Sequence, residues 1–289
     1  MGIIFVDFYG VIIKFIGNSY SSPQLAFFRN FFALIPIILL LIITRDIKNI
    51  FVGISKKFLF LCFLRGISFV LMQIFYYISI INMNFATATT LTFSSPIFIV
   101  VLSMLVLKEK IGLFRWSAIF IGFGGVLLIM NPTSELFSYI SILPLLAALC
   151  WAISNIVLKF IPENISSVKI NFYSINFSYI GSLIILLFSS DFSPVENSFD
   201  WLLLILIGIL GGIASILFSF AYRVVSPSTL APFEYLGIPS SFILGWIFFY
   251  EAPIGQLFPG VLGIVAAGFI IIWREKKLSI GKIVSNKIH

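Results

Sequence analysis

Apolar runs close to 20 residues long recur along almost the whole chain, and they restrict its fold more than any other feature. A helix needs about 20 residues to cross the hydrocarbon core of a bilayer. Charged residues make up only 10% of the chain, against roughly 25% in soluble domains. Because lipid offers no hydrogen bonds to the backbone, each run is predicted to be a transmembrane helix. Nine such runs are present: 24–43, 58–81, 85–107, 114–130, 137–160, 170–188, 201–222, 227–250 and 257–273.

The opening stretch, residues 1–16, is predicted to be a tenth helix that is short at its start. As a helix it spans about 24 Å, less than the roughly 30 Å of the hydrocarbon core. It lacks the basic first segment and the small-residue cleavage site of a signal peptide. We expect additional apolar coding sequence upstream of Met1. The predicted fold class is thus an all-α integral membrane protein with ten transmembrane helices.

The placement of the basic residues supports this count. Of the 18 Lys and Arg residues, Lys14, Arg29 and Arg65 lie inside predicted spans. With ten spans the remaining 15, which lie in connections, in the tail or within two residues of a span end, all fall on one side of the membrane. The alternate connections, 17–23, 82–84, 131–136, 189–200 and 251–256, contain no Lys or Arg. The positive-inside rule then places both termini in the cytoplasm of a bacterium, with the protein in its inner membrane. Since the net charge of +7 is spread along a membrane face, a nucleic-acid partner is not expected.

The two halves of the chain resemble each other weakly. Lys14 corresponds to Lys159 at an offset of 145 residues, Pro96 to Pro239 at 143, and Glu109 to Glu251 at 142. Five helices per half is an odd number, so the second half is predicted to enter the membrane the other way up. The predicted organisation is a first repeat over 1–130, a second over 131–277, and a basic cytoplasmic tail over 278–289.

Prolines near the middle of equivalent spans mark the candidate site. Pro96 and Pro239 are predicted either to release backbone carbonyls for a ligand between the repeats or to form packed kinks. Gly208 and Gly212, four residues apart, are typical of close helix packing.

Apart from Arg115 and Lys159 at span ends, five charged side chains fall inside the predicted spans: Asp7, Lys14, Arg29, Arg65 and Glu234. Each is costly if it faces lipid, so each is expected to face the interior. Lys14 and Arg29 are close enough to a helix end to reach the interface instead. Arg65 and Glu234 lie about 10 Å deep and either pair with each other or share a substrate. The remaining candidates for the substrate site are the polar side chains Gln73, Tyr76, Asn155 and Tyr235. The alternative is that these side chains only form hydrogen bonds between helices.

Short segments in both halves resemble the EamA-type branch of the drug/metabolite transporter superfamily, over essentially the whole chain. They are Leu25-Ala-Phe-Phe-Arg29, Leu64-Arg65-Gly66, Ser95-Pro96-Ile-Phe98, Leu107-Lys-Glu109, Trp151-Ala-Ile-Ser-Asn155, Ala231-Pro-Phe-Glu-Tyr-Leu236 and Tyr250-Glu-Ala-Pro253. The resemblance implies two inverted five-helix EamA repeats and carrier-type uptake or export of small metabolites. Within the branch the chain looks most like bacterial carriers of the S-adenosylmethionine-uptake type. It departs from them at Glu234, where those carriers tend to have Arg.

These features favour a secondary transporter for a small polar or zwitterionic metabolite, such as an amino acid or an S-adenosylmethionine-like compound, that works by alternating access. A coupling ion or counter-substrate is a possible further partner. An exporter of the same superfamily is the alternative, followed by a channel or an intramembrane enzyme. The only histidine is His289, and the chain has no P-loop and no hydrolase or metalloprotease motif. Neither catalysis, a metal nor a cofactor is therefore expected.

Overall fold

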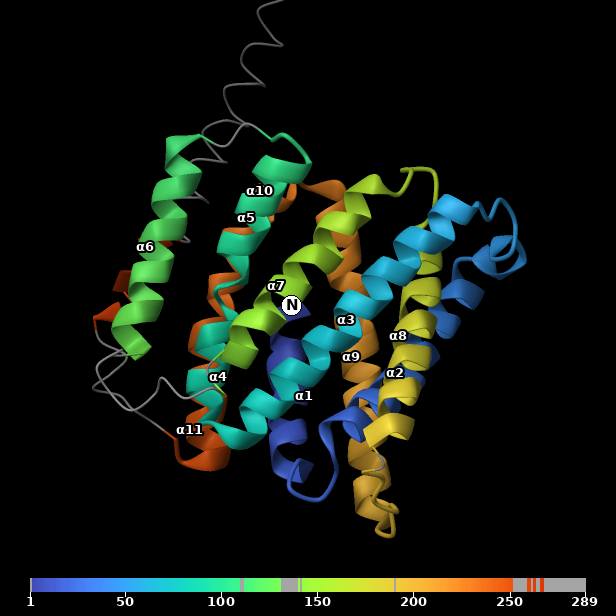
Figure 1. Cartoon of the computed structure of the whole chain (residues 1–289), viewed down its shortest axis with the longest axis horizontal. Coiled ribbons are helices and arrows are strands. Elements are labelled where there is room, and N and C mark those ends of the chain that lie inside the picture. Colours follow the sequence, from blue (N-terminus) through green and yellow to red (C-terminus); the bar gives the residue numbers. More distant parts are fainter. Residues whose placement is uncertain are drawn as a thin grey trace, which may run out of the picture.

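The computed structural model describes residues 2–109, 112–130, 140, 142–189, 191–251 and six positions between 259 and 267. In this part of the chain the regular elements are all helical (Figure 1). In chain order the elements are α1 (Gly2–Ile16), α2 (Ser22–Ile43), η1 (Asp46–Asn49), α3 (Lys56–Asn82), α4 (Phe85–Thr92), α5 (Ser95–Val106), α6 (Leu113–Met130), α7 (Ile142–Val157), η3 (Leu158–Phe160), α8 (Ser167–Ser189), α9 (Ser198–Val224), α10 (Pro227–Leu230), η4 (Ala231–Leu236) and α11 (Gly237–Phe249).

Polar residues start the long helices. The hydroxyl of Ser21 accepts a hydrogen bond from the backbone N–H of Gln24 at the start of α2, and Ser55 does the same for Phe58 at the start of α3. The Asn197 side chain accepts from the Phe199 N–H at the start of α9. Each cap satisfies a backbone donor that has no partner within the helix. The capped helices have 22, 27 and 27 residues, which at about 1.5 Å per residue is enough to cross a bilayer.

By length and composition, six described segments can cross a membrane: Ser22–Ile43, Lys56–Asn82, Phe85–Val106, Ile142–Phe160, Ser167–Ser189 and Ser198–Val224. In addition, α1 and α6 coincide with two more of the predicted spans, and α10, η4 and α11 together cover a third. Most of the predicted span 257–273 lies outside the described residues. The structure therefore shows a multi-pass helical membrane protein, and the count of ten helices stays a prediction.

Consecutive long segments alternate in direction and so separate the connections into two groups (Figure 1). The connections that follow α2, α5, η3 and α9 lie at the upper end in this view, and those that follow α1, α3 and α8 lie at the lower end. The basic residues Arg45, Lys48 and Lys108 belong to the upper group, and Asp191 and Glu196 to the lower. The two ends thus differ in charge as the sequence predicts, whereas their assignment to cytoplasm and periplasm stays a prediction.

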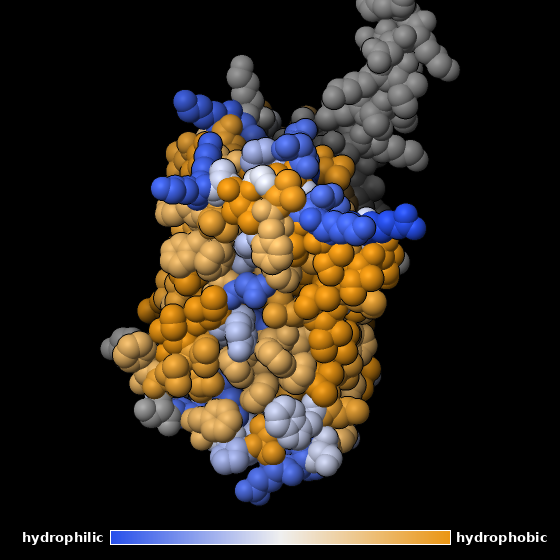
Figure 2. All heavy atoms as spheres, turned by 90° about the vertical axis from the view of Figure 1, so that its right-hand side faces the viewer, coloured by the Kyte–Doolittle hydropathy of each residue, from blue (hydrophilic) through white to orange (hydrophobic). Residues whose placement is uncertain are grey.

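A broad apolar band lies between these polar ends (Figure 2). Large side chains such as Phe31, Leu39, Phe60 and Leu187 are exposed on the surface of the chain. In water such a surface would cause aggregation, whereas in a bilayer the apolar side chains contact lipid tails without a free-energy penalty. The surface therefore fits the bilayer that the composition predicts.

Two predicted spans are broken where the sequence places a proline. The span at 85–107 is divided into α4 and α5, and Pro96 is the second residue of α5. The span at 227–250 consists of α10, the 3₁₀ segment η4 and α11, and Pro239 is the third residue of α11. Proline lacks an N–H and fits the first turn of a helix, where no such donor is needed. Each proline thus begins a new helical segment, at positions that correspond between the two halves.

Gly208 and Gly212 bring α9 against α2, as the sequence predicts. A Cβ atom at Gly208 would lie 2.9 Å from Cα of Phe32, and one at Gly212 would lie 2.7 Å from the carbonyl oxygen of Ala33. Both distances are too short for a real side chain. Glycine at these positions lets the two helix backbones approach closely.

Candidate substrate cavity

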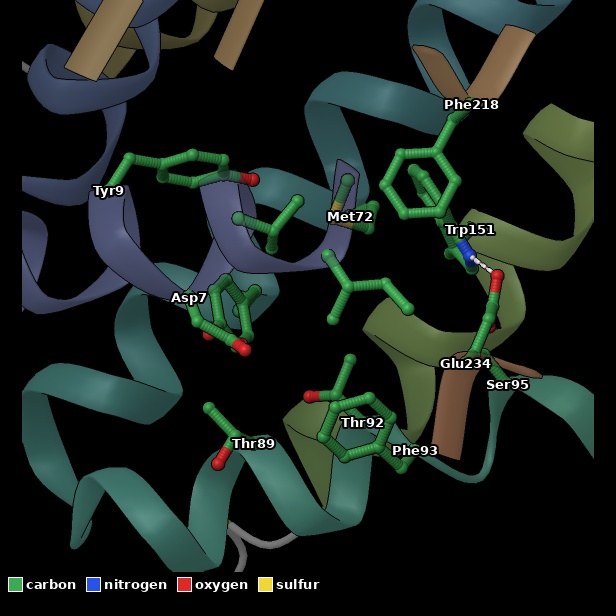
Figure 3. A pocket seen from close by; sticks show the side chains of 13 residues that line it. Asp7, Tyr9, Met72, Thr89, Thr92, Phe93, Ser95, Trp151, Phe218 and Glu234 are labelled. Atoms are coloured by element: carbon green, nitrogen blue, oxygen red, sulfur yellow. Dashed lines mark hydrogen bonds between the residues drawn. The ribbon is translucent and has the colours of Figure 1, made fainter. Parts of the chain in front are cut away.

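A cavity lies where segments of both halves of the chain meet (Figure 3). The first half contributes α1, α3, α4 and the start of α5, and the second half contributes α7, α9 and η4. The lining residues are mostly apolar or aromatic, with a few polar groups, as in many small-molecule sites. They are Ile3, Val6, Asp7, Tyr9, Met72, Tyr76, Thr89, Thr92, Phe93, Ser95, Trp151, Phe218 and Glu234.

Glu234 is held in the cavity wall by three side chains from different helices. Its Oε1 atom accepts hydrogen bonds from Nε1 of Trp151 in α7, at 2.8 Å, and from the hydroxyl of Tyr222 in α9, at 2.6 Å. Its Oε2 atom accepts from the hydroxyl of Ser95, at 2.7 Å. Ser95 is the first residue of α5, so the break before Pro96 places this donor beside the carboxylate. Glu234 is 6% exposed and joins the two halves of the chain.

Asp7 lies on the opposite side of the same cavity (Figure 3). It is 2% exposed, and one of its carboxylate oxygens accepts a hydrogen bond from the hydroxyl of Ser240 in α11. The sequence marks Asp7 as a charge inside a membrane span but not as a site residue. Asp7 lies in the short first helix, far from any recognisable motif, so nothing else in the sequence indicated that it belongs to the site.

Arg29 is buried next to the cavity but does not line it. Its guanidinium donates to the carbonyl oxygen of Gly211 at 2.7 Å and to the hydroxyl of Ser215 at 2.9 Å. It also lies over the rings of Tyr9 and Phe69, 5.8 and 4.8 Å from their centroids. Tyr9 is itself a lining residue, so Arg29 contacts the wall of the cavity without being part of it.

Gln73 belongs to the same buried polar cluster as Arg29. Its amide exchanges two hydrogen bonds with the amide of Asn30, at 2.9 and 3.0 Å, and Asn30 also accepts from Arg29 at 3.1 Å. These contacts join α2 to α3. Gln73 is fully buried and is not among the cavity-lining residues.

Arg65 and Glu234 have different partners. The guanidinium of Arg65 donates to Oδ1 of Asn171 at 3.3 Å and to the hydroxyl of Ser219 at 2.7 Å, which joins α3 to α8 and α9. Glu234 is bound by neutral donors instead. Within the described residues, the direct ion pair that the sequence allowed between them is not formed.

Lys14 forms an ion pair away from the cavity, at the lower end of the molecule in Figure 1. Its Nζ atom is 2.6 Å from Oε1 of Glu251 and donates to the carbonyl oxygen of Met83 at 3.1 Å. The other carboxylate oxygen of Glu251 accepts from the backbone N–H of Phe85, the first residue of α4, at 2.6 Å. This contact ties the end of α1 to the start of α4 and the end of α11.

The remaining candidates lie around the cavity. Tyr76 lines it directly. Asn155 is buried and donates to the carbonyl oxygen of Trp151, one turn earlier in α7. Tyr235 is fully buried, and its ring packs against Gly122 of α6. Of the ten candidates, the structure thus brings only Tyr76 and Glu234 into the cavity lining, with Pro96 next to lining residue Ser95. The roles of all ten in binding stay predictions.

Comparison with known proteins agrees with this architecture. The model of the EamA-like transporter family matches residues 1–131 and 138–273, which gives two EamA repeats. A solved crystal structure with 15% sequence identity has the same fold, with a TM-score of 0.68 over 96% of this chain and 98% of that one.

Three curated relatives are transporters with different stated cargo. The S-adenosylmethionine uptake transporter of Rickettsia bellii is 29% identical over 94% of this chain and 91% of its own length. The riboflavin transporter of Vibrio cholerae is 32% identical, but the match covers 65% of this chain and 62% of that transporter. The pseudopaline exporter of Pseudomonas aeruginosa is 25% identical over 92% of this chain and 91% of its own length. With both halves matched by the family model, the chain belongs to the EamA-like transporter family of the drug/metabolite transporter superfamily.

Proposed function

We propose that this protein is a secondary transporter that moves a small charged or zwitterionic metabolite across the bacterial inner membrane by alternating access. The observation that carries the proposal is the cavity lined by both halves of the chain, with Glu234 hydrogen-bonded to α5, α7 and α9 in its wall. In transporters built from two repeats, the substrate site lies between the repeats. Relative movement of the repeats then changes the side from which the site is reached.

The direction of α1 and α7 supports this mechanism. In Figure 1, α1 runs toward the lower end and α7, the first described helix of the second half, runs toward the upper end. Equivalent helices of the two halves are therefore antiparallel, as an inverted repeat requires.

Related residues lie at the two ends of the molecule and are suited to act as gates. At the lower end, Lys14 and Glu251 form an ion pair. Their counterparts in the other half, Lys159 and Glu109, have other partners: Lys159 donates to the carbonyl oxygen of Arg223 at 3.1 Å, and Glu109 accepts from the hydroxyl of Ser228. In our proposal the Lys14–Glu251 pair closes the lower end in this state. It opens in the other state, when Lys159 and Glu109 approach each other.

Amino acids and S-adenosylmethionine-like compounds are the preferred cargo class. Full-length similarity to the S-adenosylmethionine uptake transporter favours them, and so does a cavity with buried carboxylates and aromatic walls. A second candidate is export of a metabolite, which is favoured by similarity of comparable coverage to a pseudopaline exporter. A coupling ion or a counter-substrate would drive either direction.

Counterflow in proteoliposomes tests the proposal. Vesicles that contain the purified chain are loaded with unlabelled S-adenosylmethionine or an amino-acid mixture, and the labelled solute is added outside. A carrier gives saturable, transient accumulation of label above its equilibrium level. A channel equilibrates the label without this overshoot, and an enzyme converts it into a product. Absence of counterflow for S-adenosylmethionine, amino acids and riboflavin alike would refute the proposal.

A further inference from the structure

The ionisable side chains that line the cavity are acidic. Asp7 and Glu234 lie on opposite sides of it, and the described lining residues include no Lys, Arg or His (Figure 3). A small cavity with walls of low polarity strengthens the electrostatic potential of the charges within it. In their ionised form, two carboxylates with no base beside them give a negative potential, which attracts a cation and repels an anion.

Neither carboxylate is neutralised by a neighbouring base within the described residues. Asp7 accepts a hydrogen bond from a neutral serine hydroxyl, and the three donors to Glu234 are also neutral. The one ion pair found in this part of the chain joins Lys14 to Glu251, at one end of the molecule. Carboxylates inside a membrane are costly without a positive partner and commonly mark the path of an ion or a substrate.

The Arg29 guanidinium contacts neither carboxylate. It is bound to Asn30, Gly211 and Ser215, and it is not among the residues that line the cavity. The carboxylate group of a zwitterionic cargo would therefore have no positive side chain to meet among the described lining residues. Its amine, in contrast, would face two acids.

The rest of the lining suits an organic cation. Trp151 and Phe218 pack edge to face with their ring centroids 4.9 Å apart, and together they form an aromatic wall beside Glu234. Aromatic faces attract cations as well as planar groups. Tyr9 and Tyr76 add two further aromatic side chains to the cavity lining.

We infer that the cavity selects an organic cation of net positive charge, with an ammonium or sulfonium group held at Asp7 and an apolar or planar part against Trp151 and Phe218. This inference rests on the proposed transport function and narrows its cargo class. Asp7 binds the cargo charge directly, and Glu234 provides the second negative charge across the cavity.

Three indole compounds of nearly the same size test the charge preference. Tryptamine is a cation, tryptophan a zwitterion and indole-3-propionate an anion at neutral pH. Equilibrium binding of each is measured on the purified full chain in detergent at fixed ionic strength. We expect tryptamine to bind at least about tenfold more tightly than the other two, since a factor of ten corresponds to one favourable charge contact of about 1.4 kcal/mol. Equal binding, binding of none, or a preference for tryptophan or indole-3-propionate would overturn the inference.

A matched pair of substitutions assigns the preference to Asp7. Asp7→Asn keeps the size of the side chain and removes its charge, so tryptamine affinity should fall about tenfold while indole-3-propionate affinity does not fall. Asp191→Asn makes the same change at an exposed site at the lower end of the molecule and should leave all three affinities unchanged. Unchanged tryptamine binding in a folded Asp7→Asn chain would contradict the assignment. If this variant does not fold, the ranking of the three affinities on the wild-type chain still tests whether the cavity prefers a cation.

The binding and transport experiments fail independently. A tryptamine preference without counterflow of any solute would leave the cation site standing and refute the transport function. Counterflow together with a preference for tryptophan would support transport and refute the cation site.

Discussion

The ammonium group of Lys14 lies 2.6 Å from Oε1 of Glu251, while Oε2 of the same carboxylate accepts a hydrogen bond from the N–H of Phe85, also at 2.6 Å. One carboxylate therefore holds the end of α1 and the start of α4. Both side chains of the pair are partly buried, with 14% and 21% exposure. The pair is thus protected from solvent more than an ordinary surface ion pair.

Breaking this pair should open the lower end of the molecule. In a chain without the native Cys62 and Cys150, a cysteine is placed at cavity-lining position 89 by Thr89→Cys. We expect Glu251→Gln to speed its labelling by a membrane-impermeant thiol reagent added from the side of the lower end. Glu196→Gln, at an exposed site of the same end, is the matched control and should leave the labelling rate unchanged.

The energetic coupling of the pair is measured by a double-mutant cycle with Lys14→Met and Glu251→Gln. A partly buried pair should show a coupling of about 1 kcal/mol in the free energy of unfolding. Strictly additive effects, or labelling that is equally fast with and without the pair, would show that it does not close this end.

The charge difference between the two ends predicts the orientation of the chain. Reporter fusions after Lys57 and Lys169 should be cytoplasmic, and fusions after Asn84 and Glu196 should be periplasmic, because basic connections stay inside. The structure places the first two positions at one end and the other two at the opposite end. Alkaline phosphatase and green fluorescent protein report opposite sides and serve as controls for each other. A reproducible exchange of sides at one of these positions would contradict the topology.

Close contact between α2 and α9 makes Gly208 intolerant of even a methyl group. Gly208→Ala should lower the free energy of unfolding by about 1–3 kcal/mol, because the new Cβ would overlap Phe32. Gly124→Ala is the matched control: a Cβ there meets no atom within 4 Å. Its melting temperature should stay the same or rise slightly, since alanine favours helix. Equal melting temperatures for the two variants would show that this helix contact is less tight than it appears in the structure.

The sequence predicted the helical segments well because a membrane leaves few choices. Long apolar runs have to be helical, and the caps at Ser21, Ser55 and Asn197 lie where those runs begin. The breaks at Pro96 and Pro239 were predicted as features of continuous helices, whereas the structure begins a new segment at each. Hydropathy does not reveal such a break, because the residues on both sides of it are apolar.

The partners of the buried polar groups could not be predicted. Arg65 and Glu234 lie at similar predicted depths, yet the rotation of each helix turns Arg65 toward Asn171 and Glu234 toward Tyr222. Depth follows from counting residues, while facing direction depends on how all the helices pack. Counting residues likewise placed Asp7 inside the membrane. Its position in the cavity lining depends on helix packing, so only the structure shows it.

The most direct test of the central claim is counterflow by Glu234→Gln in proteoliposomes, with melting temperature measured on the same preparation. Glutamine fills nearly the same space and can still accept hydrogen bonds from Trp151 and Tyr222, so the variant should fold with a melting temperature close to that of the wild type. Loss of the charge at the cavity should nevertheless abolish counterflow, while Glu196→Gln transports normally. A folded Glu234→Gln chain with undiminished counterflow would contradict the claim that cargo binds in this cavity.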